Sequence, residues 1–260
     1  MKQFRNMLYP YVVWLFIMVL VPMLMILLYA FTTAGNEVTT FRFTLDNFSR
    51  FLTDTVFLDV LKRSLMIAVV TTVVCVLLGY PIAYTIAKGP ERSGFFWIML
   101  ITLPTWINML VRTYAWVGIL QDDGLVNRFL GMVYNFIPFM ILQIHSSLAK
   151  MDKSLLEAAS DLGATPMQSF LKVTLPLSLP GVLSGITLVF LPAVSSFFIP
   201  KLLGGGQYVL VGNVIETQFL TSGDWNFGSA ISLIMAVIIM LSMWLTRKVD
   251  TDPAANGKGA

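Results

Sequence analysis

The sequence is poor in charge and in the residue types that build catalytic or metal sites. Asp, Glu, Lys and Arg together make up 12% of its 260 residues, whereas about 25% is usual for a soluble domain. Hydrophobic residues make up 57%, and mean hydropathy is +0.78. So much apolar surface has to face lipid, which excludes an ordinary soluble fold. The net charge of +3 is too small to indicate a nucleic-acid partner.

The chain also lacks the constellations that would make it an enzyme. Its one cysteine, Cys75, lies in an apolar run and can form neither an intrachain disulfide nor a thiolate metal cluster. Its one histidine, His145, is more typical of a satisfied polar residue in a helix bundle than of a proton relay. A phosphate-binding loop, a zinc-ligand spacing and a nucleophile elbow are all missing. We therefore expect no catalytic residue, metal or cofactor on this chain, and no ATP site.

Long apolar runs predict an all-α membrane protein with six transmembrane helices. Each run approaches the roughly 20 residues that a bilayer span requires, and the third contains one charge, Arg112. The first run is too long for the core of a signal peptide, so we expect a retained anchor. The whole chain, 1–260, would be a single transmembrane domain. The expected spans are residues 8–31, 64–87, 95–120, 129–149, 177–200 and 228–246.

The distribution of Lys and Arg predicts that both termini are cytoplasmic. One side of the membrane would carry the two termini and the loops 88–94 and 150–176. Ten basic residues belong to that side: Lys2, Arg5, Lys88, Arg92, Lys150, Lys153, Lys172, Arg247, Lys248 and Lys258. Six belong to the other side: Arg42, Arg50, Lys62, Arg63, Arg128 and Lys201.

Three shorter patterns carry further expectations. Apolar residues mixed with charges predict a short interfacial helix that begins near Asp46. Residues 250–260 have no apolar run, which predicts a disordered tail. Gly181 and Gly185, with Ser184 between them, indicate that the fifth span packs closely on another helix or lines a path.

Residues 150–176, here termed the hairpin, have the pattern of two short helices. In the first, Asp152 is the expected N-cap, and Gly163 can adopt the left-handed conformation that ends a helix. Between these two residues, an apolar stripe recurs at helical spacing. Its members are Leu155, Ala158, Ala159 and Leu162.

The second helix of the hairpin has its own start signal. Thr165 is the expected cap, Pro166 occupies the first helical position, and Gln168 completes a capping box. Pro176 and Pro180 are expected to end this helix before the next span. The two helices would form a rigid knob that either fills a groove of a soluble partner or lies on the bilayer surface.

The spacing of Glu157-Ala158-Ala159, Gly163 and Leu175-Pro176 favours the partner. It resembles the signature of permeases of ATP-binding-cassette (ABC) importers with the type I, MetI-like fold. In that family the hairpin docks into a cleft of a cytoplasmic ATPase. The resemblance implies six coupling residues: Glu157, Ala158, Ala159, Asp161, Gly163 and Pro176.

The resemblance covers residues 59–248, the expected core permease domain, and extends to one branch of the family. The segments 103–106, 110–116 and 224–228 look like those of spermidine/putrescine permeases of the first of two types. This implies a polyamine importer subunit in the bacterial inner membrane. Its partners would be a second homologous permease, two copies of an ATPase that bind ATP and Mg, and an extracytoplasmic polyamine-binding protein. One departure is a shortened outer segment between the third and fourth spans, near residues 124–134.

A flexible polycation that crosses low dielectric needs acidic acceptors and aromatic faces. Residues of these types gather at the outer ends of two spans, although Trp and Tyr there also form interfacial belts. Arg112 fits a structural ion pair better than contact with a cation. The candidate pathway residues are Trp106, Tyr114, Trp116, Asp122, Asp123, Glu216, Asp224 and Trp225.

Three alternatives stay open at this point. An importer for another solute, such as ferric ion, an opine or thiamine, would share every structural feature and differ in uptake. An intramembrane enzyme would need an acid-base or metal constellation, which the sequence lacks. A channel or secondary carrier would need no ATPase, and its flux would persist after ATP depletion.

Overall fold

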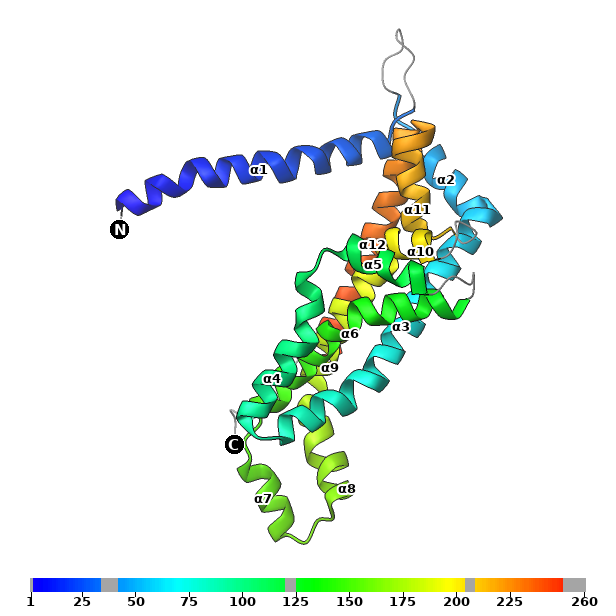
Figure 1. The fold of residues 1–260 in the computed structure, drawn as a ribbon. Coiled ribbons are helices and arrows are strands. Elements are labelled where there is room, and N and C mark those ends of the chain that lie inside the picture. Colours follow the sequence, from blue (N-terminus) through cyan, green and yellow to red (C-terminus); the bar gives the residue numbers. More distant parts are fainter. Residues whose placement is uncertain (1, 34–41, 120–124, 204–208, 250–260) are drawn as a thin grey trace. The chain divides into compact units, whose positions relative to one another are not determined.

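The computed structural model describes residues 2–33, 42–119, 125–203 and 209–249, and the regular elements there are helices (Figure 1). An isolated antiparallel bridge joins Thr32 to Phe43. The chain divides into two compact units. Unit 1 comprises residues 1–61 and 211–238, and unit 2 comprises residues 62–210 and 239–260. The predicted tail at 250–260 lies outside the described residues.

Five of the described helices are long and apolar enough to cross a membrane, or six if one bent pair counts as a single span. The prediction of an all-helical membrane protein is therefore confirmed. The five helical stretches are Tyr9–Ala30, Thr55–Lys88, Leu130–Ala149, Pro166–Ser195 and Trp225–Trp244.

The third predicted span is wrong as a straight helix over 95–120. Helix α4 (Glu91–Thr102) continues into the 3₁₀ turn η1 (Leu103–Trp106), and α5 (Met109–Ile119) then leaves at 88°. Pro104 lies in this turn, Ile107 is extended, and the Asn108 Oδ1 accepts a hydrogen bond from the Leu110 N–H at 2.8 Å. A proline followed by a capping side chain thus ends one helix and starts another.

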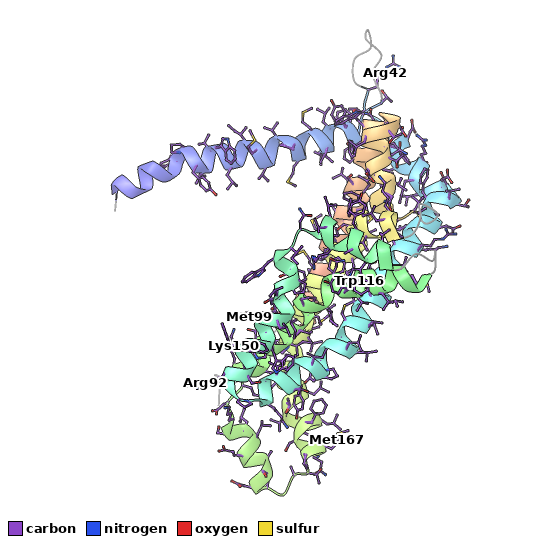
Figure 2. The ribbon with its side chains drawn as sticks, viewed as in Figure 1. Arg42, Arg92, Met99, Trp116, Lys150 and Met167 are labelled. Carbon is purple, nitrogen blue, oxygen red and sulfur yellow. The ribbon has the colours of Figure 1, made fainter. Side chains whose placement is uncertain are left out.

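Unit 1 holds helix α1 (Lys2–Ala30) at one end only. Of the span Tyr9–Ala30, only Ala30 at its end is buried within the chain, and the other side chains stand out along the helix (Figure 2). At its C-terminal end, the side-chain amide of Asn226 donates to the carbonyl oxygens of Tyr29 and Thr32 at 3.0 and 2.8 Å. The amide of Asn47 donates to the carbonyls of Ala30 and Thr32. Two asparagines therefore satisfy carbonyls that the end of a helix leaves unpaired.

The short helix predicted near Asp46 is confirmed as α2 (Asp46–Thr53), and its place at the membrane interface stays a prediction. Phe51 on α2 stacks with Phe57 of α3 (Thr55–Lys88), and Phe57 meets Phe227 of α12 (Trp225–Val249) edge to face. Phe51 and Phe227 are almost fully buried. These rings form the core of unit 1, together with the buried residues of α11 (Val211–Thr217), which is followed by the wide π turn η3 (Gln218–Ser222).

Unit 2 is built around the pair α6 (Leu125–Ala149) and α9 (Leu175–Ser195). A Cβ atom on Gly181 would lie 2.4 Å from the Ser147 Cβ, and one on Gly185 would lie 2.5 Å from the Met140 Sδ. Both glycines are therefore needed for the approach of α9 to α6. Of the two roles predicted for this part of the fifth span, close packing on another helix is confirmed.

Helix α3 covers the other side of α6 within unit 2. The Thr71 hydroxyl lies 3.9 Å from the Met132 Sδ, and the Cys75 thiol lies 3.9 Å from the Val133 carbonyl oxygen. Cys75 is free and fully buried, as expected for a small core residue. A short helix, α10 (Phe198–Leu203), packs on α5 and α6.

Candidate functional site

The hairpin begins at a carboxylate. The Asp152 Oδ1 accepts a hydrogen bond from the Ser154 N–H at 2.9 Å, and α7 (Ser154–Asp161) follows. The helix starts one residue later than an N-cap at Asp152 predicts, but the capping bond itself is present. Hydrogen bonds from the backbone and the side chain of Ser154 favour the ionised carboxylate, and they therefore lower the pKa of Asp152 from its ordinary value.

The end of α7 confirms the prediction for Gly163. This residue adopts a φ of +77°, the left-handed region that favours glycine. The Gly163 N–H donates to the Ser160 carbonyl at 2.9 Å, and the Ala164 N–H donates to the Ala159 carbonyl at 3.0 Å. This pair of bonds is a Schellman motif, which satisfies the last carbonyls of the helix.

The predicted capping box at the start of α8 (Pro166–Ser169) is confirmed in full. The Gln168 N–H donates to the Thr165 Oγ1 at 3.3 Å, and the Thr165 N–H donates to the Gln168 Oε1 at 2.9 Å. Pro166 occupies the first turn, where its missing N–H leaves no carbonyl unpaired. The turn between the two helices is therefore fixed at both ends by local bonds.

The prediction that Pro176 and Pro180 end the second helix is wrong. Helix α8 passes through the wide π turn η2 (Phe170–Thr174) directly into α9, so that Pro166–Ser195 is one continuous helical stretch. The Leu175 N–H donates to the Phe170 carbonyl, and Pro176 then lies in the first turn of α9. The wide turn accommodates a residue that lacks an N–H, which a regular helix does poorly. The second arm of the hairpin is thus the start of the fifth span.

Aromatic rings fasten this junction to α3. The Phe170 ring packs edge to face on Tyr80 and Tyr84, with centroids 5.8 and 5.2 Å apart. The Tyr80 hydroxyl lies 2.7 Å from the Ser178 hydroxyl, and both residues are buried. Sequence reasoning missed this contact, although Tyr80 and Tyr84 lie four residues apart on one helix face.

The apolar side chains at the tip of the hairpin are not covered by the chain. Leu162 is 88% exposed and Met167 is 65% exposed, and Leu155 and Leu171 are about half exposed. The acidic residues Glu157 and Asp161 are exposed as well. Figure 1 shows α7 and α8 projecting together beyond the neighbouring ends of α3, α4 and α6 within unit 2. A capped, rigid element with an uncovered apolar tip is suited to filling a groove in another protein.

The candidate pathway residues of unit 2 lie along the bend of the third span. Trp106 ends η1 and is 80% exposed, and Tyr114 on α5 is 59% exposed. Trp116 instead packs edge to face on Tyr134 of α6, with ring centroids 5.1 Å apart. The remaining two, Asp122 and Asp123, lie outside the described residues.

In unit 1 the candidates surround the start of α12. Asp224 is engaged in two contacts, since its Oδ2 lies 3.2 Å from the Arg50 Nη1 and its Oδ1 accepts from the Phe227 N–H. Trp225 is 52% exposed and contacts the rings of Tyr29 and Phe219. Glu216, on α11, is half-buried. The Asp224 carboxylate is therefore already engaged in contacts within the protein, whereas about half of the Trp225 side chain remains exposed.

Residues 1–252 match the family described as "Binding-protein-dependent transport system inner membrane component". The chain belongs to this family. It is 38% identical over 265 residues to the spermidine/putrescine transport system permease protein PotB of Salmonella typhimurium, covering 93% of this chain and 92% of the relative. The PotB protein of Escherichia coli K12 is 38% identical over 269 residues, covering 92% and 98%.

A solved structure shares the fold of this permease at low sequence identity. A bacterial alginate ABC transporter, in complex with a periplasmic protein that carries an alginate pentasaccharide, includes a chain with a TM-score of 0.76. That chain is 14% identical and is covered to 96%, as is the present one. The permease is accordingly a multi-pass inner-membrane protein, and the predicted fold of an ABC importer permease is confirmed.

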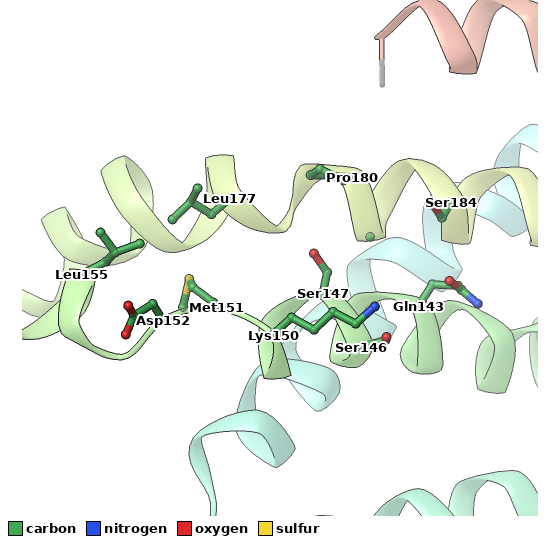
Figure 3. Close-up of a pocket in the computed structure, with 11 residues that line it drawn as sticks. Gln143, Ser146, Ser147, Lys150, Met151, Asp152, Leu155, Leu177, Pro180 and Ser184 are labelled. Carbon is green, nitrogen blue, oxygen red and sulfur yellow. The ribbon is translucent and has the colours of Figure 1, made fainter. Parts of the chain in front are cut away.

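The permease has a cavity of about 500 Å³ between α6 and α9, next to the base of the hairpin (Figure 3). Ser147 points toward α9 beside Pro180, and Gln143 and Ser184 lie further along the two helices. Polar side chains at this depth are costly unless they face protein or water. The second role predicted for the fifth span, the lining of a path, stays a prediction that this cavity supports.

Arg112 is held against an aromatic ring. Its guanidinium carbon lies 5.9 Å from the centroid of Tyr134, and its Nε and Nη1 are buried without a hydrogen-bond partner among the described residues. The expected ion pair with an acid of a second permease stays a prediction. Among the described residues, no group of three His, Cys, Asp or Glu side chains could hold a metal ion.

Proposed function

We propose that this permease forms, with a second homologous permease, the membrane pathway of an ATP-driven importer of polyamines. Support for the substrate comes from the names of the relatives, which are spermidine/putrescine permeases that this chain matches over more than nine-tenths of its length. The observation that carries the mechanism is the continuous helical stretch from the hairpin into the fifth span, Pro166–Ser195.

The hairpin would dock into a cleft of a cytoplasmic ABC ATPase, of which two copies bind ATP and Mg. Glu157, Ala158, Ala159, Asp161 and Gly163 would contact or shape this interface. Because α8 continues into α9, a shift of the docked tip would tilt the fifth span as a rigid rod. Phe170 would carry the same shift to Tyr80 and Tyr84 on α3. Pro176 would act by allowing the wide turn, not by touching the ATPase.

The orientation follows from this docking. The hairpin and both termini would lie in the cytoplasm, as the ten basic residues of that side predict. An extracytoplasmic binding protein would deliver the polyamine to the outer face. There Trp106, Tyr114, Trp225 and Glu216, with Asp122 and Asp123, would meet the cation first.

Asp224 and Trp116 have weaker claims to substrate contact. The Asp224 carboxylate would meet a passing cation only after the ion pair with Arg50 opened. The Trp116 ring is already packed on Tyr134. We propose that these two residues shape the pathway and that the exposed aromatic residues contact the substrate.

The test is reconstitution of the whole assembly in liposomes. We expect uptake of labelled spermidine and putrescine that requires ATP, the binding protein and both permeases, and ATP hydrolysis that the loaded binding protein stimulates. Unlabelled ferric ion, opine and thiamine should not compete. Uptake that is blocked by one of these three solutes and not by a polyamine would contradict the proposed substrate.

The coupling role has its own test in the same liposomes. Glu157→Ala should lower uptake at least tenfold while the protein stays in the membrane, because the docked tip would lose its acidic contact. Asp59→Ala, at an exposed acidic residue of α3 outside the hairpin, is the matched control. Unchanged uptake with Glu157→Ala would count against the docking of the hairpin.

A further inference from the structure

A cavity of about 510 Å³ lies where the hairpin meets the ends of α3 and α6. Two lysines line it, Lys88 at the end of α3 and Lys153 before α7, together with His145 and one acid, Glu157. Lys88 places its Nζ 4.6 Å from the centre of the Tyr84 ring, which also lines the cavity. His145, which the sequence predicts to be a polar residue of the helix bundle, is half-buried at this wall.

An apolar groove of similar volume, about 510 Å³, adjoins this cavity. Its walls come from α3 and α4 and include Pro81, Ile82, Trp97 and Ile101. Ile82 and Trp97 are 39% and 48% exposed, so the chain itself leaves this groove uncovered. Both helices belong to candidate membrane spans, so this groove would face lipid.

The groove and the cavity share three residues, Ile86, Gly89 and Gly94. These three residues lie where α3 meets α4. A Cβ atom on Gly94 would meet the carbonyl oxygen of Ile86 at 3.6 Å and its side chain at 3.8 Å, so the two helices are in close contact there. The groove and the cavity, here together termed the hollow, therefore adjoin at one shared wall and place an apolar surface next to a pair of lysines.

We propose that this hollow binds one anionic phospholipid of the inner leaflet. An acyl chain would lie in the groove along Ile82 and Trp97, and the phosphate would lie between Lys88 and Lys153. Two lysines against one glutamate leave the cavity with a net positive charge. Basic pockets at the inner ends of membrane helices attract the head groups of anionic lipids.

The geometry favours a lipid over the two other ligands of the same charge. A free phosphate would use the lysines but would leave the apolar groove open to water. An acidic side chain of the docked ATPase could reach the lysines from the hairpin side, but it too would leave the groove empty. A phospholipid satisfies both halves, because its charged and apolar parts are joined in the same order as the two spaces.

Such a lipid would touch the coupling element. Glu157 and Leu156 of α7 line the cavity beside Lys153, and Thr174 contributes from η2. The phosphate would neutralise the two lysines that line the cavity together with Glu157, so that they would compete less for this carboxylate when a partner binds it. This proposal goes beyond the transport function and does not depend on which solute is carried.

The test is lipid binding to the delipidated full-length permease, measured by native mass spectrometry without substrate or ATP. Phosphatidylglycerol should bind at least tenfold more tightly than phosphatidylcholine with the same acyl chains. The double variant Lys88→Gln/Lys153→Gln should abolish this preference. Lys150→Gln/Lys172→Gln removes the same charge from the inner side but from residues outside the hollow, and it should keep the preference.

A second variant separates the apolar half. Ile82→Trp should fill the groove and weaken the binding of both lipids about equally, leaving the charge preference in place. Equal binding of the two lipids by the wild type, or equal effects of the two lysine pairs, would overturn the proposal. Displacement of phosphatidylglycerol by millimolar inorganic phosphate would show a phosphate site instead. Loss of a co-purifying ATPase from the Lys88/Lys153 variant, with its lipid preference intact, would show a protein contact instead.

Discussion

The Tyr80 hydroxyl on α3 donates a hydrogen bond to the Ser178 hydroxyl on α9, with 2.7 Å between the oxygens. The direction follows from the second bond of Ser178, whose hydroxyl donates to the Leu175 carbonyl at 3.0 Å. This buried bond joins the second span to the fifth, one turn beyond the wide turn at 170–174. It fastens the first turns of α9, the helix that the hairpin would move, to α3.

Replacing Tyr80 with Phe should destabilise the permease by about 0.6 kcal/mol, the average for such bonds between membrane helices. The ring would stay against Phe170, so only the hydrogen bond is lost. The midpoint of thermal unfolding in detergent measures the change. Tyr84→Phe is the control, because its hydroxyl has no partner among the described residues, and an equal shift for both variants would contradict the assigned bond.

Gly163→Ala should strain the hairpin by about 1 kcal/mol, because a residue with a Cβ resists a φ of +77°. No atom lies within 4 Å of the added methyl group, so the effect is conformational and not steric. We expect uptake to fall more than basal ATP hydrolysis does. Gly163→Asn, which tolerates this conformation better, should retain most of the uptake, and equal losses in the two variants would argue against backbone strain.

Gly181→Ala should destabilise the α6–α9 pair by about 1–3 kcal/mol, since the added methyl group overlaps Ser147 and approaches the Gln143 carbonyl oxygen at 2.8 Å. Gly185→Ala should be milder, because it meets the flexible side chain of Met140. Expression level and the unfolding midpoint in detergent measure both effects. Gly94→Ala, which meets only ordinary contacts, should be neutral, and the reverse ranking of the two buried glycines would contradict this packing.

Asp152 should give the hairpin a defined dependence on pH. Its pKa is lowered in the folded state by the bond from Ser154, so its contribution is complete above the ordinary value of 3.8. That contribution is lost as pH falls through the lowered folded-state pKa. The difference in unfolding midpoint between wild type and Asp152→Ala should therefore be constant from pH 6 to 8 and should shrink below about pH 4. A difference that changes between pH 6 and 8 would assign the effect to another group.

Local signals in the sequence were sufficient for the caps and the short helices. Thr165 and Gln168 lie three residues apart, and Gly163 follows an apolar stripe. In both cases the residues that form the structure are neighbours in the sequence, so the local pattern is enough to predict it. The same holds for the short helix at Asp46. The branch of the permease family was also identifiable, because it rests on runs of neighbouring residues.

Features that depend on distant partners could not be predicted in this way. Prolines indicate a break but not its angle, so Pro104 bends the third span by 88° whereas Pro176 and Pro180 leave the fifth span continuous. The fifth span stays continuous because of the wide turn at 170–174, which no local sequence pattern predicts. The ion pair of Asp224 with Arg50 joins residues 174 positions apart, and only the fold brings them together.

The uninterrupted run from Pro166 to Ser195 has one more consequence. At about 1.5 Å per residue, its 30 residues span roughly 45 Å, and the wide turn at 170–174 is the place near its start where it departs from a regular α-helix. A shift of the hairpin would therefore also move the far end of α9. The size of that movement would depend on the distances of the two ends from Phe170, about which the stretch would pivot. The rate at which the pathway opens would then depend on how rigidly the Phe170 ring is packed against Tyr80 and Tyr84.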